Sequence, residues 1–471
     1  MTMKYVSTRG TAPTLTFDDV LLTGLARDGG LYVPESWPAL SPGRLKAYAD
    51  WPYAEVAVDV MWPFVEGTIE KDVFAELVDD AYSTFRHPDV VPLVELGGNL
   101  HLLELFHGPT LAFKDVALQL VGHLFDHELT KRGERVTIVG ATSGDTGSAA
   151  IEACRDRESL EIVILFPNGR VSDVQRRQMT TVPSANVHNV AIDGTFDDCQ
   201  DLVKAMFNDI PFRDEHHLSA VNSINWARIL AQVVYFVKAA AQLGAPDRPV
   251  SFTVPTGNFG NVFAGWVARR MGVPIRTLVV GSNSNDILPR FFESGVMEMQ
   301  GVHPTTSPSM DIQVSSNFER LLFELCGRNG ATVTHLMARF RDEGTMDLGP
   351  ERLAMAQEIF AAARIDDDAV ARVIAATERR TGHVVNPHTA VGLGAAALHH
   401  DPTIPMVCLA TAHPAKFPDA VEDAVGIRPE LPEHLADLFD RPERFAELPN
   451  DLAVVERYVA AVRSDPGTLA E

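Results

Sequence analysis

Short apolar segments alternate with longer segments of helical periodicity along most of the chain. The apolar segments predict buried strands at 135–142, 160–167, 185–193, 250–256, 275–282 and 405–412. The helical patterns lie at 145–156, from about Asp197, and at 224–243, 258–271, 367–382 and 388–400. Strands that alternate with helices predict parallel, doubly wound sheets, so the fold class is α/β.

The ends of the chain differ from this core. Residues 1–95 contain helical patterns that Pro and Trp residues interrupt, which predicts a mostly helical N-terminal lobe. We expect a core at 96–430, with a smaller α/β subdomain at about 131–220 and a larger one from the remainder. Residues 431–471 are rich in Pro and acidic side chains and are interpreted as a C-terminal tail.

Composition and charge narrow the classes of function. The chain has 471 residues, 46% of them hydrophobic, and a formal net charge of −23 that is spread along its length. Nucleic acid and anionic membrane surfaces are therefore poor partners. No run of about 18 apolar residues occurs. The four cysteines form no Cys-x-x-Cys pair, and this pattern favours a reducing cytoplasm.

Two glycine-rich turns stand where a predicted strand meets a predicted helix. The first, GATSGDTGS at 140–148, presents backbone N–H groups and the hydroxyls of Thr142, Ser143 and Thr146, which suit a carboxylate or a phosphate. An ordinary tight turn explains the same pattern, which matches neither a nucleotide P-loop nor a nucleophile elbow. The second, PTGNFGN at 255–261, suits a phosphate at a helix N-terminus.

Lys114 follows an apolar stretch, PTLAF, and precedes a helical pattern. An arbitrary lysine at such a place is usually a surface residue with a snorkelling stem. Poor solvation and the start of a helix both disfavour its positive charge, so it could act as an imine-forming nucleophile. An imine lysine together with a phosphate cradle indicates pyridoxal phosphate.

A metal site is not predicted. His123 and His127 are one helical turn apart, but their sequence is HLFDH, and no third ligand is indicated.

Several motifs occur together and in a fixed order along the chain. They are HGPTLAFKD (107–115), ATSGDTG (141–147), NSINWAR (222–228), PTGNFGN (255–261), SSNFER (315–320), NPHTAVG (386–392) and ATAHPAKF (410–417). On these residues the chain resembles the threonine synthase family in its longer bacterial and fungal type. The resemblance extends from YVSTRG at the N-terminus to about Ile427.

The resemblance implies a tryptophan synthase β-like fold, with two α/β domains around pyridoxal 5'-phosphate and an N-terminal segment packed on them. It implies that Lys114 forms the imine with the cofactor and that Thr411 hydrogen-bonds the pyridine nitrogen. The residues implied to hold the cofactor phosphate are Gly257, Asn258, Phe259, Gly260 and Asn261.

The resemblance also implies the reaction, in which O-phospho-L-homoserine and water give L-threonine and phosphate. Lys114 would serve as a general base after the substrate amine displaces it. The loop that grips the substrate carboxylate matches Thr142, Ser143, Asp145 and Thr146. Candidates for holding the substrate phosphate are Asn225, Arg228, Ser315, Asn317, Arg320 and Lys416, and each of them could instead be a structural ion pair or cap.

Other interpretations stay open at this point. A serine or threonine dehydratase of the same fold, or a threonine synthase-like phospho-lyase that releases 2-oxobutyrate, needs the same lysine. A non-catalytic ligand-binding protein of this fold is the third possibility. The chain is expected to be a monomer or a homodimer.

Overall fold

The structure is a computed structural model that describes residues 2–464. Its contacts divide the chain into two compact units. The large unit comprises Met1–Phe113 and Ser223–Pro429, and the small unit comprises Lys114–Asn222 and Glu430–Glu471. Each unit contains one main sheet, as the alternation of strands and helices predicts. The expected domain boundaries at 95 and 430 stay a prediction.

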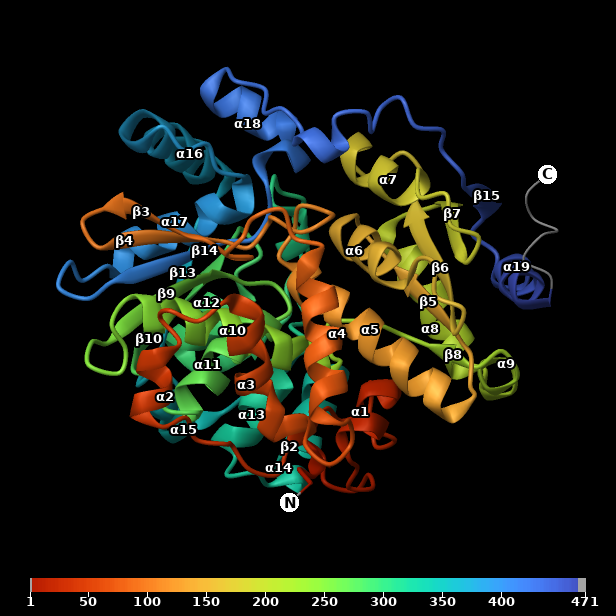
Figure 1. Ribbon diagram of the computed structural model, residues 1–471, viewed down its shortest axis with the longest axis horizontal. Helices are drawn as coiled ribbons and strands as arrows, with labels where there is room; N and C mark the ends of the chain where they lie inside the picture. The colour runs from red at the N-terminus through yellow and green to blue at the C-terminus, as the bar shows by residue number, and fades with distance from the viewer. Residues whose placement is uncertain (1, 465–471) are drawn as a thin grey trace. The chain divides into compact units, whose positions relative to one another are not determined.

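The large unit is built on a six-stranded sheet (Figure 1). Its strands are parallel except for the last pair, which is antiparallel. In spatial order they are β13 (Phe360–Arg364), β10 (Ile275–Ser282), β9 (Val250–Pro255), β14 (Met406–Ala410), β4 (Leu100–Glu104) and β3 (Leu93–Gly97). The predicted strand at 275–282 matches β10 to the residue.

Helices cover both faces of this sheet (Figure 1). They are α10 (Trp226–Gln242) and α11 (Gly260–Arg270) on one face, and α16 (Asp367–Thr381) and α17 (Pro387–His399) on the other. Two adjacent residues of β9 show the alternation. Phe252 packs against Phe236 of α10, with ring centroids 4.8 Å apart, and Thr253 donates a 2.9 Å hydrogen bond to the Gly392 carbonyl of α17. The strand is therefore buried on both sides along its whole length.

The N-terminal residues pack on α10 within the large unit. They form β1 (Tyr5–Ser7), α1 (Phe17–Thr23), β2 (Tyr32–Pro34), α2 (Pro42–Ala47), α3 (Tyr53–Val65) and α4 (Lys71–Ser83). Lys238 of α10 donates to the carbonyls of Tyr48, Ala49 and Trp51 at 2.8 to 3.0 Å. This buried ammonium accounts for three carbonyls that directly follow α2 and holds this part of the chain against α10.

The other elements of the large unit lie between β10 and the end of the unit. They are α12 (Ile287–Ser294), β11 (Val296–Glu298), α13 (Phe318–Leu325), α14 (Gly330–Glu343), β12 (Thr345–Asp347), α15 (Gly349–Gln357) and α18 (Pro418–Val425).

The small unit is built on a five-stranded, fully parallel sheet. In spatial order its strands are β15 (Ala446–Pro449), β7 (Val187–Asp193), β6 (Leu160–Pro167), β5 (Val136–Ala141) and β8 (Leu218–Ser219). Its helices are α5 (Lys114–Arg132), α6 (Asp145–Cys154), α7 (Asp173–Thr180), α8 (Phe196–Asn208), α9 (Ile210–Glu215) and α19 (Leu452–Ser464). The predicted strand at 160–167 matches β6 to the residue.

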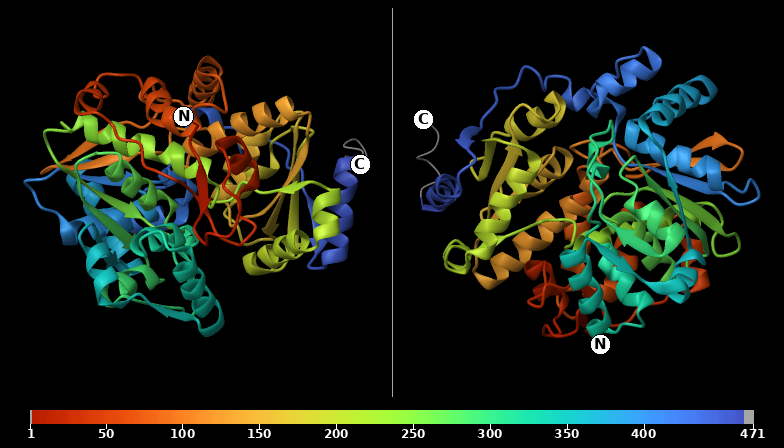
Figure 2. Two further views of the ribbon diagram at one scale, coloured as in Figure 1. Left: turned by 90° about the horizontal axis from the view of Figure 1, so that it is seen from below. Right: turned by 180° about the vertical axis from the view of Figure 1, so that it is seen from behind.

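The C-terminal segment is an ordered part of the small unit. β15 pairs with β7 at the edge of the sheet, and α19 lies beside α8 (Figure 2). Val455, Val459 and Val462 of α19 are fully buried in the core of this unit. Their spacing of four and three residues is a helical apolar stripe, a signal that the acidic composition of the segment masks. The last seven residues of the predicted tail lie outside the described residues.

Candidate active site

Lys114 begins α5 and is buried, with 8% of its surface exposed. Its Nζ donates to Asp145 Oδ2 at 3.3 Å, and Asp145 begins α6. Both residues belong to the small unit. The sequence showed the apolar residues that precede the lysine but not this carboxylate partner, which stabilises a positive charge at Nζ. The lysine is therefore a buried group with a charged partner rather than a snorkelling surface residue.

The loop before α6 is held by its own side chains. Thr142 Oγ1 accepts hydrogen bonds from the N–H groups of Gly144 and Gly147 at 3.0 and 2.9 Å. Asp145 Oδ1 accepts a 2.7 Å hydrogen bond from Gln175 of α7. No sequence spacing connects Gln175 with Asp145, which is thirty residues away, so the pattern could not reveal this contact.

Ser143 and Thr146 are the other predicted residues of this loop, and both are partly exposed. No side-chain hydrogen bond joins either hydroxyl to another residue within 2–464. Their hydroxyls are thus better placed to meet a ligand than that of Thr142, whose oxygen already accepts two N–H groups.

The second predicted cradle, Gly257–Asn261, joins β9 to α11 in the large unit. Phe259 has the left-handed φ of +61° that turns the chain into the helix. A Cβ at Gly257 would lie 2.8 Å from the carbonyl oxygen of Ser309, so the neighbouring loop requires glycine there.

The start of α11 offers hydrogen-bond donors. The N–H of Phe263 donates to the Phe259 carbonyl, whereas the N–H groups of 257–262 make no main-chain hydrogen bond within the part of the chain that the structure describes. Asn261 is buried; its Oδ1 accepts from the Tyr235 hydroxyl at 2.5 Å, and its Nδ2 has no partner among residues 2–464. Buried donors at a helix N-terminus without acceptors fit a phosphate group.

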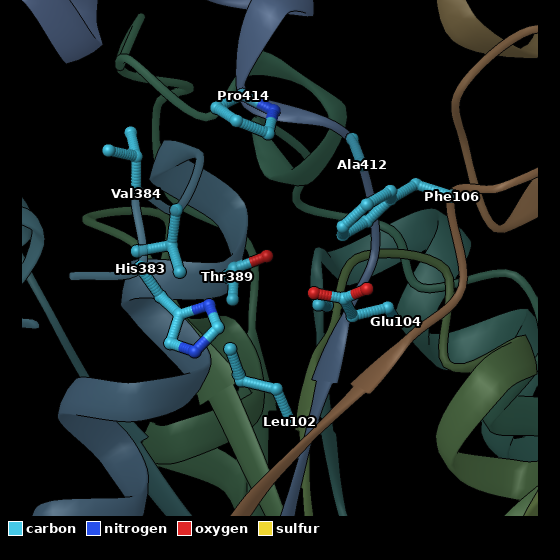
Figure 3. Close-up of a pocket in the computed structure, with 10 residues that line it drawn as sticks. Leu102, Glu104, Phe106, His383, Val384, Thr389, Ala412 and Pro414 are labelled. Carbon is cyan, nitrogen blue, oxygen red and sulfur yellow. The ribbon is translucent and has the colours of Figure 1, made fainter. Parts of the chain in front are cut away.

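Thr411 directly follows β14 and is buried. Its carbonyl accepts a 2.9 Å hydrogen bond from the N–H of Phe113, the residue before Lys114 in the chain. A small pocket lies beside this strand end in the large unit, and Figure 3 shows Glu104, His383 and Thr389 among the residues around it. Ala410 and Ala412 line the pocket, and none of the predicted site residues does.

Ser315 and Asn317 lie against the second cradle. Ser315 Oγ donates to the Gly257 carbonyl at 2.7 Å, and the N–H of Asn317 donates to the Asn258 carbonyl at 3.0 Å. The Asn317 side chain donates to the Ser223 carbonyl at 3.0 Å. These two residues fix the position of the loop that carries the open donors.

The remaining candidates for the substrate phosphate are all buried. Arg320 donates to the carbonyls of Tyr32 and Ile224, and Lys416 donates to the Thr110 carbonyl at 2.7 Å. Asn225 caps α10 by accepting from the Ala227 N–H, and its Nδ2 donates to the Leu21 carbonyl. Burial lowers the pKa of Arg320 to about 9 and that of Arg228 to about 10.

In the described range 2–464, no group of three or more His, Cys, Asp and Glu side chains is placed to hold a metal ion. Over the same residues, no helix has the length and apolar character needed to cross a bilayer.

Family models match most of the chain. The model for "Threonine synthase N terminus" matches residues 4–82, "Pyridoxal-phosphate dependent enzyme" matches 90–339, and "Threonine synthase, C-terminal" matches 389–459.

Individual proteins match it over nearly their full length. A threonine synthase of Pseudomonas aeruginosa is 54% identical over 460 residues, which cover 97% of this chain and 98% of the relative. The crystal structure of a PLP-bound threonine synthase from Brucella melitensis aligns with a TM-score of 0.96 at 56% identity, covering 98% of this chain and 99% of that one. A yeast threonine synthase structure aligns with a TM-score of 0.93 at 38% identity, covering 98% and 99%. These relatives do not favour the dehydratase and phospho-lyase alternatives.

Proposed function

The chain belongs to the threonine synthase family of pyridoxal-phosphate-dependent enzymes, and from this premise we propose that it converts O-phospho-L-homoserine and water to L-threonine and phosphate. The reaction breaks the bond between Cγ and the phosphate oxygen and adds a proton at Cγ. At Cβ the hydroxyl group of water replaces a hydrogen, and the released phosphate takes up the remaining proton, so the enzyme is a carbon–oxygen lyase. Its cofactor is pyridoxal 5'-phosphate. The observation that carries the proposal is the pair formed by a buried lysine with a carboxylate partner and a separate set of open phosphate donors.

Lys114 would hold the cofactor through Nζ. Pyridoxal phosphate, when bound, withdraws electrons from the substrate carbons and makes their protons acidic. Lys114 would then carry a proton from and to Cα of the substrate, and its burial keeps bulk water from competing for that proton. Asp145, at 3.3 Å, would stabilise Nζ in its positively charged form between transfers.

The large unit would hold the cofactor phosphate. The N–H groups at the start of α11 and the Asn261 Nδ2 supply donors, and the positive end of the helix dipole adds to their attraction. We propose that Gly257, Asn258, Phe259, Gly260 and Asn261 form this cradle. The Thr411 hydroxyl would bond the pyridine nitrogen without imposing a charge on it.

The substrate would be held by donors in an acidic protein of net charge −23. We propose that Ser143 and Thr146 bind its carboxylate, with Thr142 and Asp145 shaping the loop. For the substrate phosphate we propose Arg228, which lies in the first turn of α10 and whose guanidinium group can bind a phosphate. Asn225, Ser315, Asn317, Arg320 and Lys416 donate to main-chain carbonyls, which supports a role in positioning the loops.

Product analysis tests the proposal. Purified protein with pyridoxal phosphate and O-phospho-L-homoserine should release L-threonine and inorganic phosphate in equal amounts, measured by amino-acid chromatography and a phosphate assay. Release of 2-oxobutyrate, or no turnover, would overturn it. An incubation with L-threonine alone shows whether any 2-oxobutyrate arises from the product.

We also propose a cytoplasmic location and a monomeric or homodimeric state. The four free cysteines, three of them buried, support a reducing compartment. Sedimentation of the purified protein would establish the assembly.

A further inference from the structure

The helix α7 contacts the candidate active site through Gln175. Gln175 is 3% exposed, and its Nε2 donates to Asp145 Oδ1 at 2.7 Å. The other oxygen of the same carboxylate, Oδ2, lies 3.3 Å from Lys114 Nζ. We propose that Gln175 is a positioning residue for the reaction, which holds the Asp145 carboxylate in the one orientation that faces the lysine.

The amide of Gln175 is itself fixed at both ends. Its Oε1 accepts a 3.0 Å hydrogen bond from the Ser172 hydroxyl, and the same hydroxyl accepts from the Gln175 N–H to cap α7. The side chain also packs against the loop before α6, because a Cβ at Gly144 would lie 2.5 Å from Gln175 Cδ. Gly144 has a φ of +139°, which a side chain would strain. Gln175 therefore has little freedom to turn away from Asp145.

The helix that carries Gln175 is anchored by the C-terminal segment. Glu443 accepts from Arg176 Nε and Nη2 at 2.9 and 3.1 Å and from the Thr180 hydroxyl at 2.7 Å, and Arg177 lies 3.2 Å from it. The Arg444 N–H donates to the Thr180 carbonyl at 2.6 Å. Arg177 of α7 also donates to the carbonyls of Phe439 and Arg441 in the same segment. A chain of contacts thus leads from Glu443 through α7 to Gln175, Asp145 and Lys114, all within the small unit.

The chemical consequence follows from the geometry of a carboxylate. A buried carboxylate has two oxygens, and a strong donor on one of them fixes where the other points. Removing that donor loosens the hold on the orientation of the carboxylate, which weakens the stabilisation of positive charge on Nζ. Asp115, the neighbour of Lys114 on α5, is the other buried acid at this helix start, and it stays in place in every variant below.

The test follows the visible absorbance of the loaded protein against pH. This inference rests on the proposed function, because it needs the cofactor on Lys114. The band near ~410 nm reports the positively charged nitrogen. We expect Gln175→Met, which keeps the volume and removes the donor, to lose this band at a pH about one unit lower than the unmodified protein does.

Two comparisons calibrate that shift. Asp145→Asn removes the charge and should give the largest shift in the same direction. Gln119→Met makes the same exchange at another buried glutamine, on α5, whose Nε2 has no hydrogen-bond partner among residues 2–464, and it should leave the profile unchanged.

The outcomes separate the two proposals. A protein that shows no band with pyridoxal phosphate overturns the proposed function itself. A band with the same pH profile in Gln175→Met as in the unmodified protein overturns the positioning role, whatever happens to the rate of turnover. Should Gln175→Met yield no folded protein, Ser172→Ala and Glu443→Gln disturb the same chain from outside the site. Each should shift the profile downward by a smaller amount, and no shift in both would equally overturn the proposal.

Discussion

Two glycine-rich turns of this protein have nearly the same local design and opposite electrostatic character. Each follows a central parallel strand, β5 or β9, and opens a helix, α6 or α11. In the first turn Thr142 satisfies two N–H groups and Asp145 places a carboxylate at the helix start. In the second turn the N–H groups of 257–262 have no main-chain acceptor within residues 2–464, and over the same residues the buried Nδ2 of Asn261 has no hydrogen-bond partner.

This difference in charge and open donors determines which kind of group each helix start can bind. In the first turn the Asp145 carboxylate attracts a cation, and its neighbour is Lys114, so the proposed substrate carboxylate is left to the neutral hydroxyls of Ser143 and Thr146. A turn with open donors needs an anion from outside the chain, and a phosphate ester meets that need. The two turns are complementary halves of the proposed chemistry, one for the reactive amine and one for the cofactor phosphate.

The largest expected effect is the loss of the amine. Lys114→Ala should reduce turnover by at least ~10³-fold, because no other group supplies both the covalent attachment and the proton transfer at Cα. Threonine release measures turnover, and circular dichroism shows that the fold persists. Lys131→Ala on the same helix, where the lysine is half exposed, is the control. Turnover within tenfold of the unmodified protein would contradict the role of Lys114.

The next change makes the second turn resemble the first. Asn261→Asp replaces an open donor by a buried carboxylate, so the affinity of the apoprotein for pyridoxal phosphate should fall by about 100-fold through like-charge repulsion. Absorbance titration measures the dissociation constant. Asn258→Asp adds the same charge at an exposed neighbour, where solvent screens it, and should have a smaller effect. Equal losses at the two positions would contradict the asymmetry.

A steric change tests the shape of the second turn. Gly257→Ala brings a Cβ to 2.8 Å from the Ser309 carbonyl, so the loop must move. We expect about tenfold weaker binding of pyridoxal phosphate, from ~1–2 kcal/mol of overpacking. Gly301→Ala is the matched control, since a Cβ there meets no atom within 4 Å. An unchanged affinity for Gly257→Ala would show that the loop is not held by its neighbour.

The smallest effect concerns the anchor of the first turn. Hydrogen bonding from Arg176 lowers the pKa of Glu443 from its usual value of 4.5. Because the folded pKa is the lower one, its stabilising contribution is fully present above 4.5 and is lost as the pH falls through the folded pKa. Glu443→Gln should therefore lower the free energy of unfolding by about 1 kcal/mol at pH 7, and by less below pH 4.5.

Urea unfolding at the two pH values measures this loss. Glu447→Gln removes an acid that is exposed on β15 and serves as the control. A difference between Glu443→Gln and the parent that stays constant down to pH 3 would contradict the ion pair as its source.

Much of the secondary structure could be predicted from pattern alone. The strands at 160–167 and 275–282 were predicted to the residue, because strands covered on both faces are rich in apolar residues. The strands β3, β4, β13 and β15 were missed because residues of differing burial are mixed along them. In addition, β15 lies in the segment that was interpreted as a tail. The C-terminal segment was interpreted as a tail because its charge hides the apolar stripe of α19.

The chemistry of the site was predictable only in part. Lys114 and the two glycine-rich turns stand out locally, because an unusual lysine environment and glycines at strand ends are visible in a short window of sequence. Gln175 and Glu443 were not found, since their partners lie 30 and 267 residues away and nothing in the spacing connects them. Ser309 was missed for the same reason, because its contact with Gly257 exists only in the folded chain.

The sequence by itself determined which groups are available: one lysine that follows an apolar stretch, two turns able to receive an anion, and an alternation of strands and helices. These follow from local propensities and from periodicity, which depend on near neighbours. Only the tertiary structure decided which turn already holds its anion and which one keeps its donors open. That choice depends on the distances between side chains from separate helices and loops, and electrostatic energy and hydrogen bonding are set by those distances rather than by sequence separation.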